Sequence, residues 1–325
     1  MKAAFIGCGV IGEKRAEALG AKIQIVGCFD LNIQKAEAFA KVYQCDVYES
    51  EMDLINDESV DFVVIATQHN NLAKLAIDCL NRKKHVFLEK PGACNAQDLA
   101  NVSEIAKKNL LNLHIGYNHQ FHPAILKMNE LVQQGDIGDL MFARIRYGHG
   151  GRIGYEKEWR AKKEISGGGE LIDQGSHLID LVLKLFGDLK VSYAATPTYF
   201  WNMEVEDNAF VVLEDIQGRI SFLHASCTEW KNLFSMELYG TGGKLEVEGL
   251  GRSYGVETLT FYKMLPEMGP PKITKFTYDE PDISWKLELE QFIKDIEQKT
   301  YTSDNSQSSI RVLQIIEDIY QRTGR

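Results

Sequence analysis

The chain has 325 residues, 44% of them hydrophobic and 25% charged, as is ordinary for a globular protein of one large or two smaller domains. Its formal net charge of -10 argues against a general nucleic-acid binder, because such proteins need a basic face. No apolar run reaches the length of a membrane span and the first residues lead directly into a strand, so we expect a cytoplasmic protein that binds no membrane. The six cysteines form no C-x-x-C pair, so neither a metal site nor a disulfide framework is predicted.

A glycine-rich loop follows the first predicted strand, at residues 3–6, and precedes a helix that extends to residue 18. Its pattern, G-x-G-x-x-G, is typical of dinucleotide binding in this setting. The first glycine allows a tight turn, the second lets a pyrophosphate approach the backbone, and the third lets helix and strand pack closely. N–H groups at the start of the helix would hold phosphate. The loop residues predicted to bind the dinucleotide are Gly7, Gly9, Val10, Ile11 and Gly12.

The second predicted strand, at residues 23–29, ends at Asp30. An acidic residue at this distance from the glycine loop holds the ribose diol and repels a 2′-phosphate. Leu31 and Asn32 supply no cation that would welcome such a phosphate. The sequence therefore favours NAD(H) over NADP(H). The alternative is that Asp30 only caps the following helix.

The first half of the chain alternates predicted strands and helices, which indicates a parallel Rossmann sheet with helices on both faces. Further strands are predicted at 60–66, 85–88 and 113–116, and helices at 32–42, 71–81 and 95–108. Polar residues that follow the strand ends should line one crevice beside the dinucleotide. Those assigned to the cofactor are Thr67, Gln68, Glu89, Lys90 and Asn118, and Tyr117 is assigned to the substrate.

The strand at 85–88 ends in the sequence Glu89-Lys90-Pro91. Proline cannot donate to a strand ladder and restricts the residue before it, so the strand must stop near Lys90. Chemistry in an open parallel sheet lies just past the carboxyl ends of the strands. Lys90 is therefore a candidate functional residue. The alternative is that these residues form only a polar turn.

The second half of the chain has a different pattern of predicted elements, with many strands and few helices. Strands are predicted at 140–147, 210–213, 219–225, 234–239, 244–247 and 257–262, and helices at 124–134, 284–299 and 307–320. This pattern indicates an α+β domain with a large, mostly antiparallel open sheet. We expect a dinucleotide-binding domain at residues 1–120 and a substrate-binding and oligomerisation domain at residues 121–325.

A second chemical cluster follows three consecutive glycines at 167–169. Asp173, His177 and Asp180 are spaced so that a helix would place all three on one face. Polar groups in so apolar a segment need partners or a function. Either His177 is a buried histidine satisfied by Asp173, or the two residues take part in chemistry.

Taken together, these motifs resemble the glucose–fructose oxidoreductase/inositol dehydrogenase family (Gfo/Idh/MocA) of NAD(P)-dependent oxidoreductases, over essentially the whole chain. The resemblance rests on the glycine loop, on Glu89-Lys90-Pro91, and on the glycines 167–169 followed by Asp173, Gly175, His177 and Asp180. It implies that Lys90, Asp173 and His177 occupy catalytic positions. It also implies a homodimer or homotetramer formed through the second sheet, and a Lys90–Pro91 peptide that can be cis.

The residue types suit alcohol oxidation, in which hydride goes to the nicotinamide while a base takes the hydroxyl proton. His177 titrates near neutrality, Asp173 could orient its ring, and Lys90 could hydrogen-bond the reacting oxygen. Whether His177 or Lys90 accepts the proton stays open. Three positions depart from the family pattern, and these are Gln68 for a proline, Leu72 for a histidine and Gln120 for an arginine.

A basic and aromatic segment at residues 144–163 stands out in this acidic chain. We expect it to hold the anionic group of a sugar phosphate, nucleotide sugar or uronate; the alternative is a solvated loop or a subunit contact. The predicted substrate residues are Lys90, Tyr117, Arg152, Tyr155, Trp159, Arg160, Asp173 and His177. The leading function is thus an NAD(H)-dependent dehydrogenase or reductase of an anionic sugar derivative. Competing functions are a neutral sugar or inositol dehydrogenase, a glycosidase-like enzyme without net redox, and a non-catalytic sensor.

Overall fold

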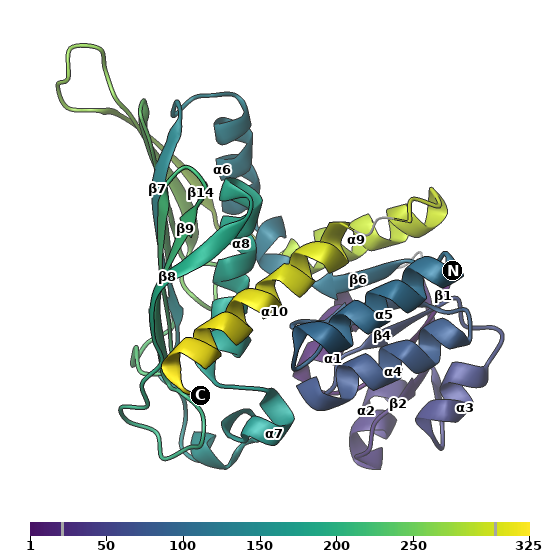
Figure 1. Cartoon of the computed structure of the whole chain (residues 1–325). Coiled ribbons are helices and arrows are strands. Elements are labelled where there is room, and N and C mark those ends of the chain that lie inside the picture. The colour runs from purple at the N-terminus through teal and green to yellow at the C-terminus, as the bar shows by residue number, and fades with distance from the viewer. Residues whose placement is uncertain (21–22, 302–303) are drawn as a thin grey trace. The chain divides into compact units, whose positions relative to one another are not determined.

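The computed structural model describes residues 1–20, 23–301 and 304–325. The chain folds into two compact units (Figure 1), the first made of Met1–Tyr117 with Trp285–Arg311 and the second of Asn118–Ser284 with Val312–Arg325. The chain first passes from one unit to the other between residues 117 and 118, close to the expected boundary at residue 120. The chain also returns to the first unit for residues 285–311, which a single boundary does not describe.

The first unit is built on a six-stranded parallel sheet with the strand order β3-β2-β1-β4-β5-β6. Its strands are β1 (Lys2–Ile6), β2 (Gln24–Phe29), β3 (Asp46–Val47), β4 (Phe62–Ile65), β5 (His85–Glu89) and β6 (Leu113–Gly116). Its helices are α1 (Val10–Ala18), α2 (Ile33–Tyr43), α3 (Glu51–Asn56), α4 (His69–Asn81), α5 (Ala96–Asn109) and α9 (Ser284–Glu297). This arrangement confirms the predicted Rossmann sheet.

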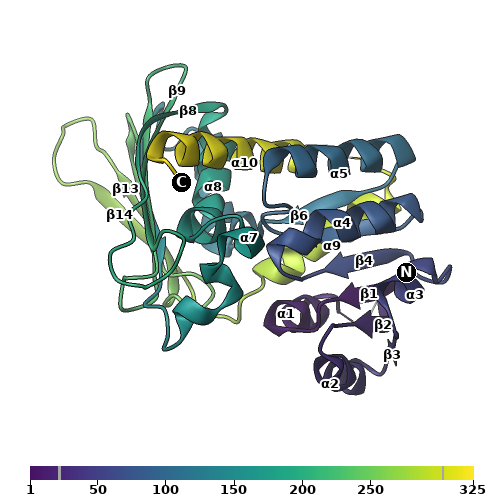
Figure 2. The ribbon, with the colours of Figure 1, turned by 60° about the horizontal axis from the view of Figure 1, so that its bottom comes forward.

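Apolar side chains on both faces of this sheet explain its helix layers. Phe5, Phe62 and Phe87 form one buried cluster with Phe39 of α2 and Phe292 of α9. Figure 2 shows α4 and α5 on the other side of the sheet from α1 and α2. Burial of both faces is what a parallel sheet requires, and the central strand β4 is accordingly a continuous apolar run. The carboxyl ends of the strands therefore carry the polar residues of this unit.

The second unit contains an eight-stranded sheet with the order β14-β13-β12-β11-β7-β10-β9-β8. Its strands are β7 (Leu140–Gly148), β8 (Leu189–Ala195), β9 (Asn208–Asp215), β10 (Ile220–Ser226), β11 (Leu233–Gly240), β12 (Gly243–Glu248), β13 (Glu257–Lys263) and β14 (Lys272–Tyr278). Only the pairing of β7 with β10 is parallel among these described strands, so the predicted mostly antiparallel sheet is confirmed.

Helices cover one face of the second sheet, as Figure 1 shows for α6 (Pro123–Gln133) and α8 (Ser176–Phe186). The last helix, α10 (Asp304–Thr323), contributes residues to both units. Along β11, buried side chains alternate with half-buried ones, which is the pattern of a sheet with one core face. Ile220 and Phe222 of β10 are exposed on the opposite face. Among the described residues, no helix has the length and apolarity needed to cross a membrane.

Several short or irregular elements were not predicted. The edge strand β14 is exposed along most of its length and mixes lysines and threonines with apolar residues, so it shows no burial alternation. The other edge strand, β8, contains a register shift between Val191 and Tyr193. A bulge of this kind breaks the period of two on which strand prediction depends.

Candidate active site

The glycine loop has the geometry that dinucleotide binding requires. Gly7 has a φ of +100°, and a Cβ added there would lie 2.4 Å from the carbonyl oxygen of Ala66. A Cβ on Gly12 would lie 2.1 Å from the carbonyl oxygen of Gly7, so helix α1 can approach the loop only without a side chain. A Cβ on Gly9 would meet nothing within 4 Å. The loop therefore turns tightly at Gly7 and packs closely against α1 at Gly12. The free space at Gly9 fits a pyrophosphate.

Helix α1 starts at Val10, directly after this room. Gly9 precedes the helix and has no side chain with which to cap the first N–H groups. The first N–H groups of a helix have no intrahelical partner, and they favour negative charge. The N–H groups of Val10 and Ile11 thus belong to a helix start that suits phosphate.

Asp30 is held in place at the end of β2. Its Oδ2 accepts a hydrogen bond from the backbone N–H of Cys8 at 2.8 Å, and its Oδ1 accepts one from the N–H of Asn32, also at 2.8 Å. Each carboxylate oxygen keeps a further lone pair for a ribose hydroxyl. Helix α2 is capped by the Asn32 side chain, which accepts from Gln34 and Lys35. Asp30 is therefore not the helix cap, and its position fits the ribose of NAD.

The Glu89-Lys90-Pro91 turn ends β5, and its Lys90–Pro91 peptide is cis, as the resemblance implies. Lys90 is half-buried. Glu89 points back into the unit, where its Oε1 lies 2.5 Å from Nε of Arg15 in α1. Nη1 of the same guanidinium lies 2.6 Å from Oε2 of Glu288 in α9. The turn that carries Lys90 is thus joined to two helices by one fully buried ion cluster.

The ion cluster is enclosed by aromatic rings. The Arg15 guanidinium lies 4.4 Å from the ring centroid of Phe87 and 4.3 Å from that of Trp285. Nε2 of His114 lies 3.2 Å from Oε1 of Glu288. Burial raises the pKa of Glu89, and the nearby Arg15 partly offsets this rise. Sequence reasoning missed Arg15 and Glu288, because their contact joins residues 273 positions apart.

In the second unit, the predicted cluster lies at the start of α8. Asp173 belongs to a π-helical turn, η4 (Leu171–Gly175), and His177 to the first turn of α8. Both side chains are buried, with His177 4% exposed. Gly169 allows the turn to form, because a Cβ there would lie 2.0 Å from the carbonyl oxygen of Glu206. Oε1 of Glu206 accepts hydrogen bonds from Gly169 and Leu171, which fixes the turn.

His177 and Asp173 have partners that the sequence did not indicate. The imidazole of His177 stacks on that of His119, with ring centroids 3.8 Å apart and planes 17° apart. Tyr147 meets the His177 ring edge-on at 6.0 Å. Oδ2 of Asp173 lies 2.9 Å from Nε of Arg160. The carboxylate of Asp173 thus pairs with a half-buried guanidinium, and the imidazole of His177, one helical turn further on, stacks on a second buried imidazole.

Glu170 adds an acid group to this site. Its Oε1 accepts a hydrogen bond from the Tyr155 hydroxyl at 2.8 Å and lies 3.7 Å from Nε2 of His149. Burial, reinforced by the charge of Asp173, raises the pKa of Glu170 to about 8. Burial lowers the pKa of His149. Carboxyl groups with a pKa raised by burial and a neighbouring charge are typical of functional sites, yet no sequence pattern singled out Glu170.

Most cations of the basic segment are exposed, and Arg160 is its half-buried member. Arg152 is 60% exposed as a side chain and lies 2.5 Å from Oε2 of Glu158. Arg160 is half-buried over the ring of Trp159, at 4.5 Å from its centroid. Tyr155 is buried. Arg152 is therefore the member of the predicted substrate set that presents a positive charge to solvent.

The remaining predicted residues lie as follows. Thr67 and Gln68 are half-buried between β4 and α4, and Tyr117 is buried in the first unit. Asn118 belongs to the second unit, where its amide donates to Oγ of Ser284 at 2.9 Å. Thus the structure brings the cofactor residues of the first unit together at one sheet edge, and it brings Arg160, Asp173 and His177 together in the second.

Two of the three departures from the family pattern, Gln120 and Leu72, have local explanations. Gln120 donates to Oδ2 of Asp180 at 2.6 Å and accepts from Nζ of Lys184 at 2.7 Å. An uncharged amide can do both, whereas an arginine could not accept from Lys184. Leu72 is fully buried in α4, where it contributes to the core. His69 is buried at the start of the same helix.

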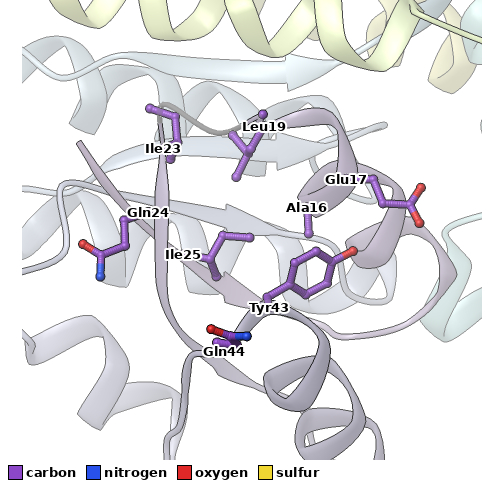
Figure 3. A pocket seen from close by; sticks show the side chains of 9 residues that line it. Ala16, Glu17, Leu19, Ile23, Gln24, Ile25, Tyr43 and Gln44 are labelled. Atoms are coloured by element: carbon purple, nitrogen blue, oxygen red, sulfur yellow. The ribbon is translucent and has the colours of Figure 1, made fainter.

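A separate hollow of about 440 Å³ lies at the amino end of β2, between the ends of α1 and α2 (Figure 3). Tyr43, Leu19 and Ile25 contribute to its wall. Asp30 stands at the other end of β2, so this hollow is not the predicted dinucleotide site.

Comparison with known proteins places the chain in a family. Residues 1–117 match the model described as "Oxidoreductase family, NAD-binding Rossmann fold", and residues 125–246 match the "GFO/IDH/MocA C-terminal domain". The chain therefore belongs to the GFO/IDH/MocA oxidoreductases, as the sequence motifs indicated. This membership confirms the prediction of an NAD(P)-binding first unit.

Individual relatives are more distant. Glucose-6-phosphate 3-dehydrogenase of Bacillus subtilis is 24% identical over 220 residues, which are 66% of this chain and 62% of that protein. Inositol 2-dehydrogenase of Salmonella typhimurium is 29% identical over 153 residues, which are 45% of this chain and 46% of that protein. The matched stretches thus span about half to three fifths of these relatives.

Two solved structures illustrate the shared fold. Levoglucosan dehydrogenase in complex with NADH and levoglucosan has a TM-score of 0.88 at 19% identity, covering 100% of this chain and 97% of that one. KijD10, a 3-ketoreductase from Actinomadura kijaniata in complex with NADP and TDP-benzene, has a TM-score of 0.86 at 17% identity, covering 99% and 97%. At these identities the likeness concerns the fold.

Proposed function

We propose that this protein is an NAD(H)-dependent oxidoreductase that transfers hydride between the nicotinamide and a secondary alcohol or ketone of an anionic sugar derivative. The observation that carries the proposal is the group of buried His177 and Asp173 with the half-buried Arg160, in a chain whose first unit has the dinucleotide loop. Family membership supports the redox chemistry, and the names of the relatives point to sugars and cyclitols.

The bound dinucleotide supplies the hydride acceptor at its nicotinamide. During oxidation of an alcohol, the hydroxyl proton passes to a base while the C–H bond gives up hydride and a carbonyl forms. His177 or Lys90 takes this proton, because imidazole and amine nitrogens can both accept one. Asp173, held by Arg160, would stabilise the imidazolium, and a protonated Lys90 would stabilise negative charge on the reacting oxygen. Reduction runs the same steps backwards.

The proposed preference for NAD(H) rests on Asp30. Its carboxylate is fixed by two backbone N–H groups and so cannot easily turn away from a 2′-phosphate. Bringing two negative charges together at this site costs free energy, whereas two ribose hydroxyls can donate to the same carboxylate.

The proposed anionic substrate rests on Arg152, which is one of several exposed cations in the basic segment and lies over the ring of the buried Tyr155. One observation favours a neutral sugar or cyclitol instead. Arg152 already pairs with Glu158, and Arg160 with Asp173, so both positive charges are balanced within the protein. A glycosidase-like reaction without net redox would use the same NAD-binding unit and is separated from both by experiment.

Absorbance of the nicotinamide band, followed with NAD and a panel of sugars, cyclitols, uronates, sugar phosphates and nucleotide sugars, tests this function. We expect turnover with at least one anionic member and a large loss of kcat/KM when its charged group is removed. Turnover of neutral sugars alone would contradict the anionic class. Release of a leaving group without any absorbance change, together with NAD retained through purification, would contradict net redox.

We also propose that the protein forms a homodimer or homotetramer through the uncovered face of its second sheet. Ile220 and Phe222 of β10 are each 37% exposed on that face, and Phe142 of β7 stacks on Tyr239 of β11 at 4.3 Å. Light scattering after size-exclusion chromatography would give a dimer or tetramer mass. A Phe222→Glu variant should lower that mass, and a monomeric unaltered chain would contradict the proposal.

A further inference from the structure

A series of four aromatic rings runs from the buried site of the second unit to its surface. Tyr155 lies 5.6 Å from Trp201 between ring centroids, Trp201 lies 5.1 Å from Phe200, and Phe200 lies 4.7 Å from Trp230. Tyr155 is 2% exposed, whereas Phe200 is 60% and Trp230 is 64% exposed. The outer two rings stand nearly perpendicular, at 83°, and so form an open aromatic corner.

The aromatic corner is held firmly from behind. The buried carboxylate of Asp207 accepts backbone hydrogen bonds from Tyr199, Phe200 and Trp201, at 2.7 to 3.0 Å. The indole N–H of Trp201 donates to the carbonyl of Cys227 at 2.9 Å. Burying a carboxylate costs free energy unless the carboxylate is hydrogen-bonded. Asp207 has these hydrogen bonds, and they order the loop.

Trp230 adds a second sign of constraint. It has a φ of +55°, in the left-handed region that bulky residues rarely adopt. A Cβ on Gly150 would lie 3.0 Å from the Cα of Trp230, and a Cβ on Gly151 would lie 2.3 Å from the ring of Trp201. The loop that carries Arg152 is thus fitted against the aromatic rings. Large apolar rings that are both exposed and fixed in this way are typical of binding surfaces.

The inner end of the series meets the proposed catalytic cluster. The Tyr155 hydroxyl donates to Glu170, and the Arg152 guanidinium lies 5.5 Å from the centroid of the Tyr155 ring. Tyr155 also feels the charge of Asp173, which pairs with Arg160. From Tyr155, with Arg152 over its ring, the series continues outward to Trp201 and then to the aromatic corner. This order of acid–base group, cation and aromatic rings parallels a ligand with a reacting sugar, a phosphate group and a planar base.

We propose that Phe200 and Trp230 stack the nucleobase of a nucleoside diphosphate sugar, while Arg152 contacts the diphosphate. This inference rests on the proposed function and selects one of its three anionic substrate classes. All nucleobases can stack on aromatic side chains, so the aromatic corner alone does not determine which nucleobase binds. A second sugar ring or a second copy of this chain could also cover exposed aromatic rings, and both are outcomes of the test.

Calorimetric titration of the full-length protein, saturated with NADH so that the dinucleotide site is filled, separates these possibilities. The probes are UDP, TDP, GDP and inorganic pyrophosphate. We expect the best nucleoside diphosphate to bind roughly tenfold or more tightly than pyrophosphate, which lacks a base to stack. Trp230→Ala should abolish most of this difference and leave the affinity for pyrophosphate unchanged, and Phe200→Ala should act in the same direction. Arg152→Ala should weaken all four probes.

Tyr193→Ala on β8 is the matched control, because Tyr193 is equally exposed, at 60%, and lies outside the aromatic series. Its affinities should equal those of the unaltered protein, and thermal melting should show all variants folded. Equal affinity for pyrophosphate and nucleoside diphosphates in the unaltered protein would overturn the inference. So would a Trp230→Ala variant that lowers the oligomer mass but binds the probes normally.

The failures of the two proposals are distinguishable. If Arg152→Ala weakens pyrophosphate and a sugar phosphate while Trp230→Ala changes nothing, the anionic substrate stands and the nucleobase subsite falls. If no probe binds and only neutral sugars are turned over, the anionic substrate itself is wrong. If disaccharides bind through Trp230 and nucleoside diphosphates do not, the aromatic corner takes a sugar ring instead.

Discussion

The proposed chemistry depends on individual side chains, and above all on His177. It lies buried against His119, one helical turn after Asp173, whose carboxylate is paired with Arg160. Motif spacing located His177 and Asp173, whereas His119, Arg160 as the partner of Asp173, and Glu170 became evident only from the fold. The π-helical turn and the strand ends determine which of these residues lie close together. The spacing of residues along the sequence does not reveal these contacts.

Replacement of His177 tests its role directly. We expect His177→Asn to lower kcat/KM by about two to four orders of magnitude, the usual contribution of a general acid–base group. The affinity for NADH, measured by fluorescence titration, should not change, because the dinucleotide loop belongs to the first unit. A variant with nearly full kcat and the same pH profile would exclude His177 as the base.

Asp30 should determine the choice of cofactor. Asp30→Ser removes the charge that opposes a 2′-phosphate and one acceptor for the ribose hydroxyls. We expect the KM for NAD to rise about tenfold or more and the KM for NADP to fall. Steady-state kinetics with both cofactors measures this, and an unchanged ratio of kcat/KM values would contradict the ribose assignment.

Glu170 makes a pH dependence measurable. Burial raises its pKa from 4.5 to about 8 in the folded protein, so the folded state holds a proton that the unfolded state has lost. The free energy of unfolding should therefore fall as pH rises between about 4.5 and 8, by up to about 1.4 kcal/mol per pH unit. Above pH 8 this contribution should level off.

Glu170→Gln keeps an oxygen that can accept from Tyr155 but cannot ionise. Urea unfolding between pH 5 and pH 9 should give a flatter stability profile for this variant than for the unaltered chain. Parallel profiles would mean that Glu170 does not titrate as described.

At the level of elements, the ion cluster behind Lys90 joins α1, β5 and α9. Arg15 lies between the carboxylates of Glu89 and Glu288 and between two aromatic rings, all fully or nearly buried. The strands and helices themselves were largely predictable, because parallel strands here are continuous apolar runs and α4 shows clear helical spacing. The return of α9 to the first unit was not predictable, since its amphipathic pattern does not say which sheet it covers.

Removal of Arg15 should destabilise this junction strongly. Arg15→Met leaves two buried carboxylates without their cation, a change that typically costs about 3 to 5 kcal/mol of unfolding free energy. Lys41→Met in α2 removes an exposed charge outside this cluster and should cost less than about 1 kcal/mol. Chemical denaturation compares the two, and equal small losses would show that Glu89 and Glu288 are neutral in the folded protein.

For the whole molecule, the chain combines an NAD-binding unit with a unit that carries the proposed acid–base residues, and it belongs to the GFO/IDH/MocA oxidoreductases. Its architecture could be read from the alternation of strands and helices followed by a strand-rich half. The aromatic corner could not, because Phe200 and Trp230 are separated in the sequence and each alone reads as an ordinary loop residue.

The central claim is hydride transfer at a secondary carbon of a sugar derivative, with Lys90 at the reacting oxygen. The most direct measurement uses NADH that carries deuterium at the transferring position, incubated with the best keto-sugar substrate from the panel. We expect deuterium at one carbon of the product, with the rate reduced by orders of magnitude in Lys90→Met while the protein still binds NADH. Product formation without deuterium transfer, or a nearly full rate in Lys90→Met, would contradict the account.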